Sequence, residues 1–168
     1  MPGYASGSTS FTGIDISSVI SSDNKYWGGV LHNNGKIYFV PLYSDNIGEF
    51  DPVTRTFSVI DISSTNSGPH QYCGGVLAHT GMIYFIPNNA DNIGEFNPRT
   101  FSAIDISSTI SSDDKYLGGV LGPNGMIYFV PYNTGNIGEF NPVSRTFSVI
   151  DISSTISSDA KYIDIAHA

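Results

Sequence analysis

The stretch GGVLGPNGMIYFVP at residues 118–131, followed by NIGEF at 136–140 and FSVIDI at 147–152, decides the fold because close copies of it occur three times. The Gly-Gly pairs begin at Gly28, Gly74 and Gly118, so the copies are 46 and 44 residues apart. Fixed self-similarity at such a period is typical of propellers and other repeat architectures. The chain is therefore predicted to be an array of similar units.

The shorter spacing has a visible cause in one connection. The segment DPVTRT at 51–56 is trimmed to NPRT at 97–100 in the second repeat. A connection that tolerates such a deletion is expected to be a surface turn.

Each repeat is predicted to form a four-stranded meander. Short apolar runs flank Asn34-Gly35, and an Asn-Gly pair between such runs favours a type I′ hairpin with positive φ at both central residues. Pro41 is expected to end the second strand, because proline lacks a ladder donor. The segment 56–62, rich in β-branched and aromatic residues, is predicted to be the fourth strand.

The run Ile37-Tyr38-Phe39-Val40 is apolar on both faces of its strand, so both faces should be covered. Face-to-face stacking of successive sheets would cover them, and the Gly-Gly pairs would let the innermost strands crowd near an axis. The predicted class is all-β, with three four-stranded antiparallel propeller-type blades of 44–46 residues, an orphan N-terminal strand and a C-terminal tail.

The segments NGKIYF at 34–39 and NIGEFDPVT at 46–54 resemble the blade signature of kelch-type and streptogramin-lyase-like β-propellers. This resemblance covers the three repeats and implies blade architecture. The lyases use a catalytic histidine and a metal site, and the sequence matches neither. No enzymatic activity, cofactor or metal site is therefore expected.

The predicted organisation has three parts. Residues 1–10 form a flexible arm without the basic and apolar regions of a signal peptide, which leaves an extracellular location as no more than a guess. The blade array spans 11–154, with repeats at 11–56, 57–100 and 101–146 and a partial fourth at 147–154. Residues 155–168 form a tail that is expected to be a terminating or docking strand.

Composition narrows the partners. Apolar residues make up 40% of the 168 residues, charged residues 13%, and the net charge is −8 with seven Lys and Arg. Nucleic acid is not an expected partner of so acidic a chain. No apolar run approaches the roughly 20 residues of a membrane span. The single cysteine, Cys73, replaces Trp27 and Leu117 of the sister repeats and is predicted to be a buried filler.

Three blades do not comfortably close a ring, since propellers typically have about 4–8. Uncovered blade faces at both ends form a heterologous interface for a second copy, which gives rings or filaments. The favoured function is a non-enzymatic structural protein whose blades self-associate into a closed oligomer or filament. The orphan strand at 11–18 and the tail supply the apolar residues expected to assist assembly, which are Phe11, Ile14, Ile16, Ile163 and Ile165.

The alternative function is a multivalent carbohydrate-binding module. Aromatic, hydroxyl and carboxylate groups recur between blades, and a sugar could stack on such rings. The candidate ligand-binding residues are Tyr26, Trp27, Asp23, Tyr72, Tyr116 and Asp113. The competing interpretation is that the tyrosines pack between blades with bonded hydroxyls.

The remaining repeated polar residues are interpreted as structural. Asp15, Asp61, Asp105 and Asp151 precede Ser-Ser and are predicted to form Asx turns. Glu49, Glu95 and Glu139 are expected to be hydrogen-bonded strand carboxylates. The four histidines have no catalytic spacing and are predicted to be surface loop residues.

Overall fold

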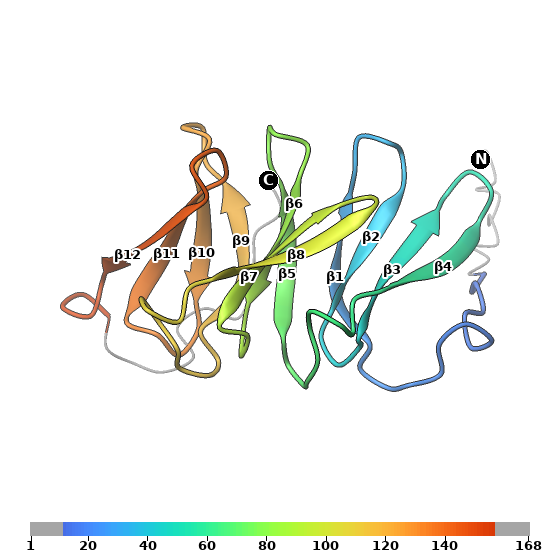
Figure 1. Cartoon of the computed structure of the whole chain (residues 1–168), viewed down its shortest axis with the longest axis horizontal. Helices are drawn as coiled ribbons and strands as arrows, with labels where there is room; N and C mark the ends of the chain where they lie inside the picture. The colour runs from blue at the N-terminus through green and yellow to red at the C-terminus, as the bar shows by residue number, and fades with distance from the viewer. Residues whose placement is uncertain (1–11, 157–168) are drawn as a thin grey trace, which may run out of the picture.

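The computed structural model describes residues 12–156. They form twelve strands in three four-stranded antiparallel sheets that lie side by side in chain order, and no helix occurs in this range (Figure 1). The predicted all-β class with three propeller-type blades is confirmed.

Each sheet is a meander in which consecutive strands pair. Blade 1 contains β1 (Tyr26–Leu31), β2 (Ile37–Pro41), β3 (Asn46–Asp51) and β4 (Thr56–Asp61). Blade 2 contains β5 (Tyr72–Leu77), β6 (Ile83–Pro87), β7 (Asn92–Asn97) and β8 (Thr100–Asp105). Blade 3 contains β9 (Tyr116–Leu121), β10 (Ile127–Pro131), β11 (Asn136–Asn141) and β12 (Thr146–Asp151). The second strands end at a proline, as expected.

The first strands of the three blades approach one another through single glycines. Gly28, Gly74 and Gly118 have φ of 81°, 81° and 106°, at a register shift in each first strand. A Cβ on Gly28 would lie 3.7 Å from the Cα of Gly74, and a Cβ on Gly74 would lie 3.2 Å from the Cα of Gly118. The predicted crowding of the innermost strands is confirmed; the positive φ favours glycine at all three positions, and close approach favours it also at Gly74.

The hairpin between the first two strands differs from the prediction. The Gly35 N–H donates to the His32 carbonyl oxygen at 2.9 Å, and only Gly35 in this turn has positive φ. The turn is therefore a three-residue hairpin loop with a left-handed glycine rather than a two-residue type I′ turn. Because the residue before the glycine keeps negative φ, Thr80-Gly81 fits the same turn as Asn34-Gly35.

The turns after β4, β8 and β12, and the equivalent turn at 15–17, follow the predicted Asx pattern. The backbone N–H groups of Ser17, Ser63, Ser107 and Ser153 donate to the Oδ1 atoms of Asp15, Asp61, Asp105 and Asp151 at 2.8–2.9 Å. These hydrogen bonds hold the pKa of all four carboxyl groups below the usual value.

The orphan strand predicted at 11–18 does not form over residues 12–18, which have no strand assignment. A strand needs a partner for its backbone groups, and the described blades already have their own fourth strands, β4, β8 and β12. The local turn survives without a sheet, since the Val19 and Ile20 N–H groups both donate to the Ile16 carbonyl oxygen at 3.0 Å. Phe11 lies outside the described residues.

Two apolar cores hold the blades together, one on each side of blade 2. The first joins Val30, Tyr38, Val40, Ile47 and Ile62 to Tyr72, Ile83, Phe85, Ala90 and Phe96. The second joins Val76, Tyr84, Ile86, Ile93 and Ile106 to Tyr116, Ile127, Phe129 and Phe140. The stability of the array therefore depends on interfaces between neighbouring blades, as in other repeat proteins.

Candidate functional site

Both interfaces inside the chain join the same pair of surfaces. The earlier blade supplies a smaller aliphatic surface around Tyr38 or Tyr84, and the later blade supplies a phenylalanine-rich surface around Phe85 or Phe129. Ring packing crosses each interface: Tyr38 lies 5.1 Å from Phe96 and Tyr84 lies 4.9 Å from Phe140, between ring centroids. Each blade thus has two different faces, and the faces pair in one order only.

Polar contacts supplement the apolar cores. The Arg145 Nη2 atom lies 2.8 Å from Glu95 Oε2, and the Tyr84 hydroxyl lies 3.1 Å from Glu95 Oε1 and 3.3 Å from the Pro142 carbonyl oxygen. Burial first, and then the negative charge of Glu95, raise the pKa of Tyr84 to about 12. The hydroxyl therefore stays protonated at neutral pH and is available as a hydrogen-bond donor.

Lys115 is fully buried where blade 3 meets the second blade. Its Nζ atom lies 3.3 Å from Asp91 Oδ1, 3.3 Å from the Asn89 carbonyl oxygen and 2.5 Å from the Ser112 carbonyl oxygen. A buried ammonium is tolerated only with such partners. Lys115 fixes the linker before β9 against the loop between β6 and β7.

The outer face of blade 1 consists of Tyr26, Leu31, Ile37, Phe39, Phe50 and Phe57. These residues correspond by repeat position to the phenylalanine-rich surface that blade 2 buries against blade 1. Leu31 is 62% exposed, whereas its equivalent Leu77 is packed against the first core.

The outer face of blade 3 consists of Val120, Tyr128, Val130, Ile137 and Ile150. These residues correspond to the aliphatic surface that blade 2 buries against blade 3. Val120 is 51% exposed, whereas its equivalent Val76 is buried. The two outer faces are therefore the two halves of the interface that already occurs twice within the chain.

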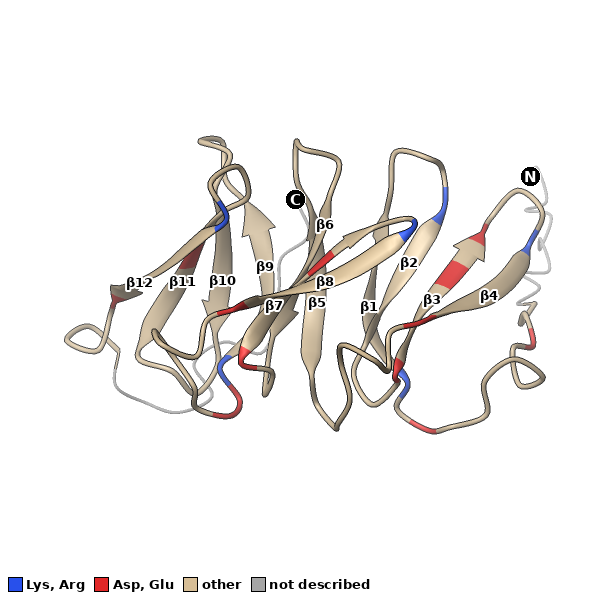
Figure 2. Cartoon of the chain, viewed as in Figure 1, with Lys and Arg blue, Asp and Glu red and all other residues tan. Residues whose placement is uncertain are grey.

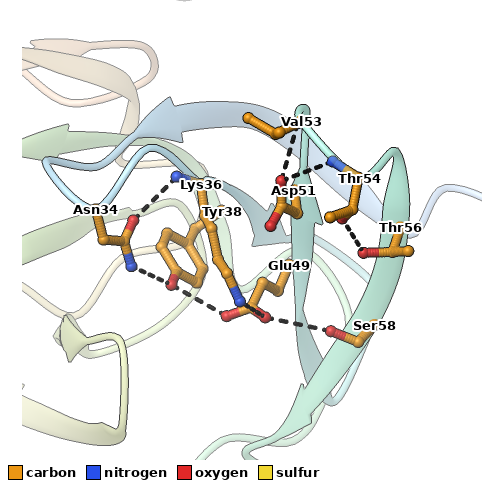
Figure 3. A network of polar contacts seen from close by, with 9 residues as sticks. All are labelled: Asn34, Lys36, Tyr38, Glu49, Asp51, Val53, Thr54, Thr56 and Ser58. Atoms are coloured by element: carbon orange, nitrogen blue, oxygen red, sulfur yellow. Dashed lines mark hydrogen bonds and ion pairs between the residues drawn. The ribbon is translucent and has the colours of Figure 1, made fainter.

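Charge on the molecule lies mainly at the strand ends and connections, with acidic bands within the third strands β3, β7 and β11 (Figure 2). The band in β3 is Glu49, which accepts hydrogen bonds from Lys36 Nζ at 2.6 Å, the Tyr38 hydroxyl at 3.0 Å and the Ser58 hydroxyl at 3.4 Å (Figure 3). The interpretation of the repeated glutamates as hydrogen-bonded strand carboxylates is confirmed.

The candidate glycan-binding tyrosines are packing residues in two of the three blades. Tyr72 and Tyr116 are fully buried, and the hydroxyls of Tyr26, Tyr72 and Tyr116 donate to Asn46, Asn92 and Asn136 at 2.7, 2.5 and 2.5 Å. Neither Tyr72 nor Tyr116 presents a ring to solvent.

The other candidate ligand-binding residues lie at the surface. Trp27 is 49% exposed, and Asp23 and Asp113 are exposed. Cys73, in the Trp27 position of blade 2, is buried as predicted, and burial raises the pKa of its thiol to about 12.

The residues proposed to assist assembly are only partly within the described range. Ile14 is exposed and Ile16 is half-buried, and both lie outside the three sheets. Phe11, Ile163 and Ile165 lie outside the described residues.

Histidine and acidic side chains show no grouping for a metal. Across residues 12–156, no three His, Cys, Asp or Glu side chains are arranged to hold an ion. His32, predicted to be a surface residue, is half-buried and bridges two blades, with Nε2 3.0 Å from the Gly81 carbonyl oxygen. Within the same range there is no helix of the length and hydrophobicity that crossing a membrane requires.

Comparison with known proteins places the fold in the β-propeller class. The structure is similar to virginiamycin B lyase from Staphylococcus aureus, with a TM-score of 0.65 at 16% identity, over 79% of this chain and 43% of that chain. It is also similar to a streptogramin B lyase, with a TM-score of 0.63 at 20% identity, over the same 79% and 43%. A third similar structure is the extracellular domain of a putative hybrid two-component system from B. thetaiotaomicron, with a TM-score of 0.61 at 13% identity, over 78% and 18%.

No protein-family model matches the sequence, and no curated protein matches it. The chain spans less than half the length of the lyases whose fold it shares.

These comparisons correct one expectation. The sequence-based exclusion of an enzyme is wrong, because the structures that share this fold include an enzyme, virginiamycin B lyase. The absence of a recognisable catalytic pattern could not support that exclusion. At 14–20% identity, the likeness extends to the fold and not to the reaction.

Proposed function

We propose that this chain is a self-associating β-propeller repeat protein. In the proposed assembly, the outer face of blade 3 in one copy packs against the outer face of blade 1 in the next. The observation that carries the proposal is that these two faces repeat, residue type for residue type, the surfaces buried between blades 1 and 2 and between blades 2 and 3.

The hydrophobic effect supplies the driving force. Leu31, Val120 and Ile150 are exposed on the outer faces, whereas their equivalents in blade 2 are covered: Val76 is buried, and Leu77 and Ile104 pack against the cores. Burial of apolar surface stabilises association in proportion to its area. The two faces differ from each other, so the interface is heterologous and leaves one free face at each end of a growing assembly.

The number of blades bears on whether an assembly can close. Three blades cover 43% of the virginiamycin B lyase chain, which corresponds to a length of about seven blades, within the usual range for propellers. Two copies would supply about 86% of that length, and three copies would exceed it. A ring of about seven blades is not a whole multiple of three, which favours an open polymer over a closed one.

The test is light scattering behind size exclusion across a concentration series of the 18.0 kDa chain. We expect the mass to rise with concentration and to keep rising. A discrete dimer of about twice the chain mass would instead indicate a closed six-bladed ring. A monomer at every concentration would overturn the proposal.

Two matched variants assign the association to the faces. Leu31→Lys and Val120→Lys each place a charge on one outer face, and we expect both to abolish the rise in mass. Val143→Lys is the control, since Val143 stays 81% exposed although its turn adjoins the interface between blades 2 and 3. Normal association of the two face variants would contradict the proposed interface.

Carbohydrate binding remains a second candidate function in a narrower form. The half-exposed Trp27 favours a single glycan site on blade 1, whereas the burial of Tyr72 and Tyr116 argues against three equivalent pockets. Titration of a glycan panel into dilute Leu31→Lys protein, followed by Trp27 fluorescence, tests this function without interference from assembly. No response to any glycan would eliminate it.

A further inference from the structure

Three equivalent glutamates have different cationic partners. Glu49, Glu95 and Glu139 occupy the same place in β3, β7 and β11, and each accepts a hydrogen bond from the serine opposite, Ser58, Ser102 or Ser148, at 3.4, 3.0 and 3.3 Å. The serine contact is thus common to all blades. The cation that neutralises the carboxylate is not.

At Glu95 the cation comes from the following blade. Arg145, in the turn between β11 and β12, reaches back to Glu95 at 2.8 Å, and the carbonyl oxygen of Pro142 in the same turn lies 3.3 Å from the Tyr84 hydroxyl. The residue of blade 2 that precedes β6 is Met82, which packs against the second core.

At Glu49 the cation comes from the same blade. Lys36 replaces the methionine before β2 and lies 2.6 Å from Glu49. The turn between β7 and β8 of blade 2, which corresponds to the Arg145 turn of blade 3, is the trimmed turn at 97–100. Its Arg99 forms no ion pair among residues 12–156. Between blades 1 and 2, a short turn of the later blade therefore faces a blade with a lysine before its second strand. Between blades 2 and 3, a long turn of the later blade faces a blade with a methionine at that position.

The outer face of blade 3, which contains Glu139, has a methionine at the position that Lys36 occupies in blade 1. Met126 stands before β10, and no cation of the described chain lies within ion-pair distance of Glu139. By the pattern of the two internal interfaces, this face is suited to a long turn that carries an arginine.

Blade 1 presents such a turn on the complementary face. Arg55 has φ of 58°, identical to Arg145. In the blade 1 turn, Asp51 Oδ1 accepts from the N–H groups of Val53 and Thr54 at 2.9 and 3.2 Å. Asn141 Oδ1 accepts from the equivalent N–H groups in blade 3 at 2.9 and 3.1 Å. The two turns therefore hold their arginines in the same backbone geometry, and the Arg55 side chain is exposed.

We propose that Arg55 of one copy forms an ion pair with Glu139 of the next, and that the Tyr128 hydroxyl of the second copy meets the Pro52 carbonyl oxygen of the first. This inference rests on the proposed function and specifies which groups select the partner. The pair sets the order of the faces, because like charges at this position oppose any other docking.

Charge exchange between copies tests the pair. Arg55→Glu leaves two carboxylates facing each other in an assembly of that variant, and Glu139→Arg leaves two guanidinium groups. We expect each variant alone to associate at least about 100-fold more weakly than the natural chain, as like-charge juxtaposition at an interface costs several kcal/mol. An equimolar mixture restores opposite charges at every interface and should associate within about tenfold of the natural chain, since each tenfold is about 1.4 kcal/mol.

The mixture also controls for folding, because recovered assembly requires both variants to be folded. Arg99→Glu makes the same charge change on the trimmed turn and should leave association unchanged. Sedimentation velocity gives the association constant for the natural chain, the three variants and the mixture.

The outcomes separate the two proposals. If the natural chain does not associate, the proposed function fails. If it associates and the single variants do so equally well, or if mixing them restores nothing, the Arg55–Glu139 pair is refuted while the self-association stands.

Discussion

Blade 2 and the two outer blades have nearly the same second strand but bury it differently. In β6 all four residues of the run Ile83–Ile86 are buried. In the equivalent run of β2, 37–40, only Tyr38 and Val40 are buried, and in that of β10, 127–130, only Ile127 and Phe129, which lie on the opposite face. The comparison shows that the burial of a residue here is decided by the neighbouring blade and not by the sequence of its own strand.

The largest expected effect comes from truncating the same ring in the two settings. Phe85→Ala removes a fully buried side chain and should lower the free energy of unfolding by about 3–5 kcal/mol. Phe39→Ala, at the half-buried equivalent in blade 1, should cost about 1–2 kcal/mol, because less apolar surface returns to water.

Urea unfolding at a concentration where the chain is monomeric measures both variants. Equal costs would show that the outer face of blade 1 is covered in solution even in the monomer, contrary to the structure.

A smaller effect is expected at the glycines of the innermost strands. Gly74→Ala adds a Cβ 3.2 Å from the Cα of Gly118 at a φ of 81°, and should destabilise the chain by about 1–3 kcal/mol. Gly28→Ala has the same φ but a 3.7 Å approach, so it should cost less.

Thermal unfolding of these two variants and of Gly35→Ala separates the cost of steric crowding from the cost of the backbone conformation. Gly35 has a φ of 83° and no neighbouring atom within 4 Å of an added Cβ, so it reports the backbone cost alone. If all three variants lose the same stability, close approach of the strands contributes nothing.

The smallest effect is the dependence of stability on alkaline pH. Burial raises the pKa of Cys73 to about 12 from a usual value of 9.0, and burial raises the pKa of Tyr26 to about 12 from 10.0. The unfolded chain loses these protons first, so the stabilisation is complete below about pH 9 and is lost as the pH rises toward 12.

Urea unfolding at pH 8, 9, 10 and 11 should therefore show a constant free energy up to about pH 9 and then a decline. Cys73→Ala should decline less steeply between pH 9 and 10 than the natural chain. An identical slope in both proteins would mean that the thiol is not protected by the fold.

Much of this fold could be predicted from sequence because the meander is local. Strands joined by turns of a few residues pair with their chain neighbours, so apolar runs and turn residues locate them. The N-terminal segment shows the limit of that approach. Residues 12–18 resemble a fourth strand, yet only the Asx turn at Asp15 forms there, because the turn needs nearby residues and the strand needs an open sheet edge.

The candidate site was harder to predict because it depends on pairs of blades. Tyr72 and Tyr116 resembled ligand-binding residues in isolation, but the faces of their neighbours bury them. The Arg145–Glu95 pair was also missed. The available signal was the joint occurrence of Lys36 in one repeat and a trimmed turn in the next, because a deletion in a turn alone is also what an ordinary surface connection tolerates.

The trimmed turn of blade 2 has a consequence for how an assembly could be observed. Only the interface between blades 1 and 2 combines a lysine with a short turn, so in a polymer joined through the outer faces this interface would recur at every third blade. A filament of nearly identical blades would then contain one distinguishable interface per chain. Image averaging over single blades would blur this interface. Averaging over three blades would recover it and reveal the direction of the filament.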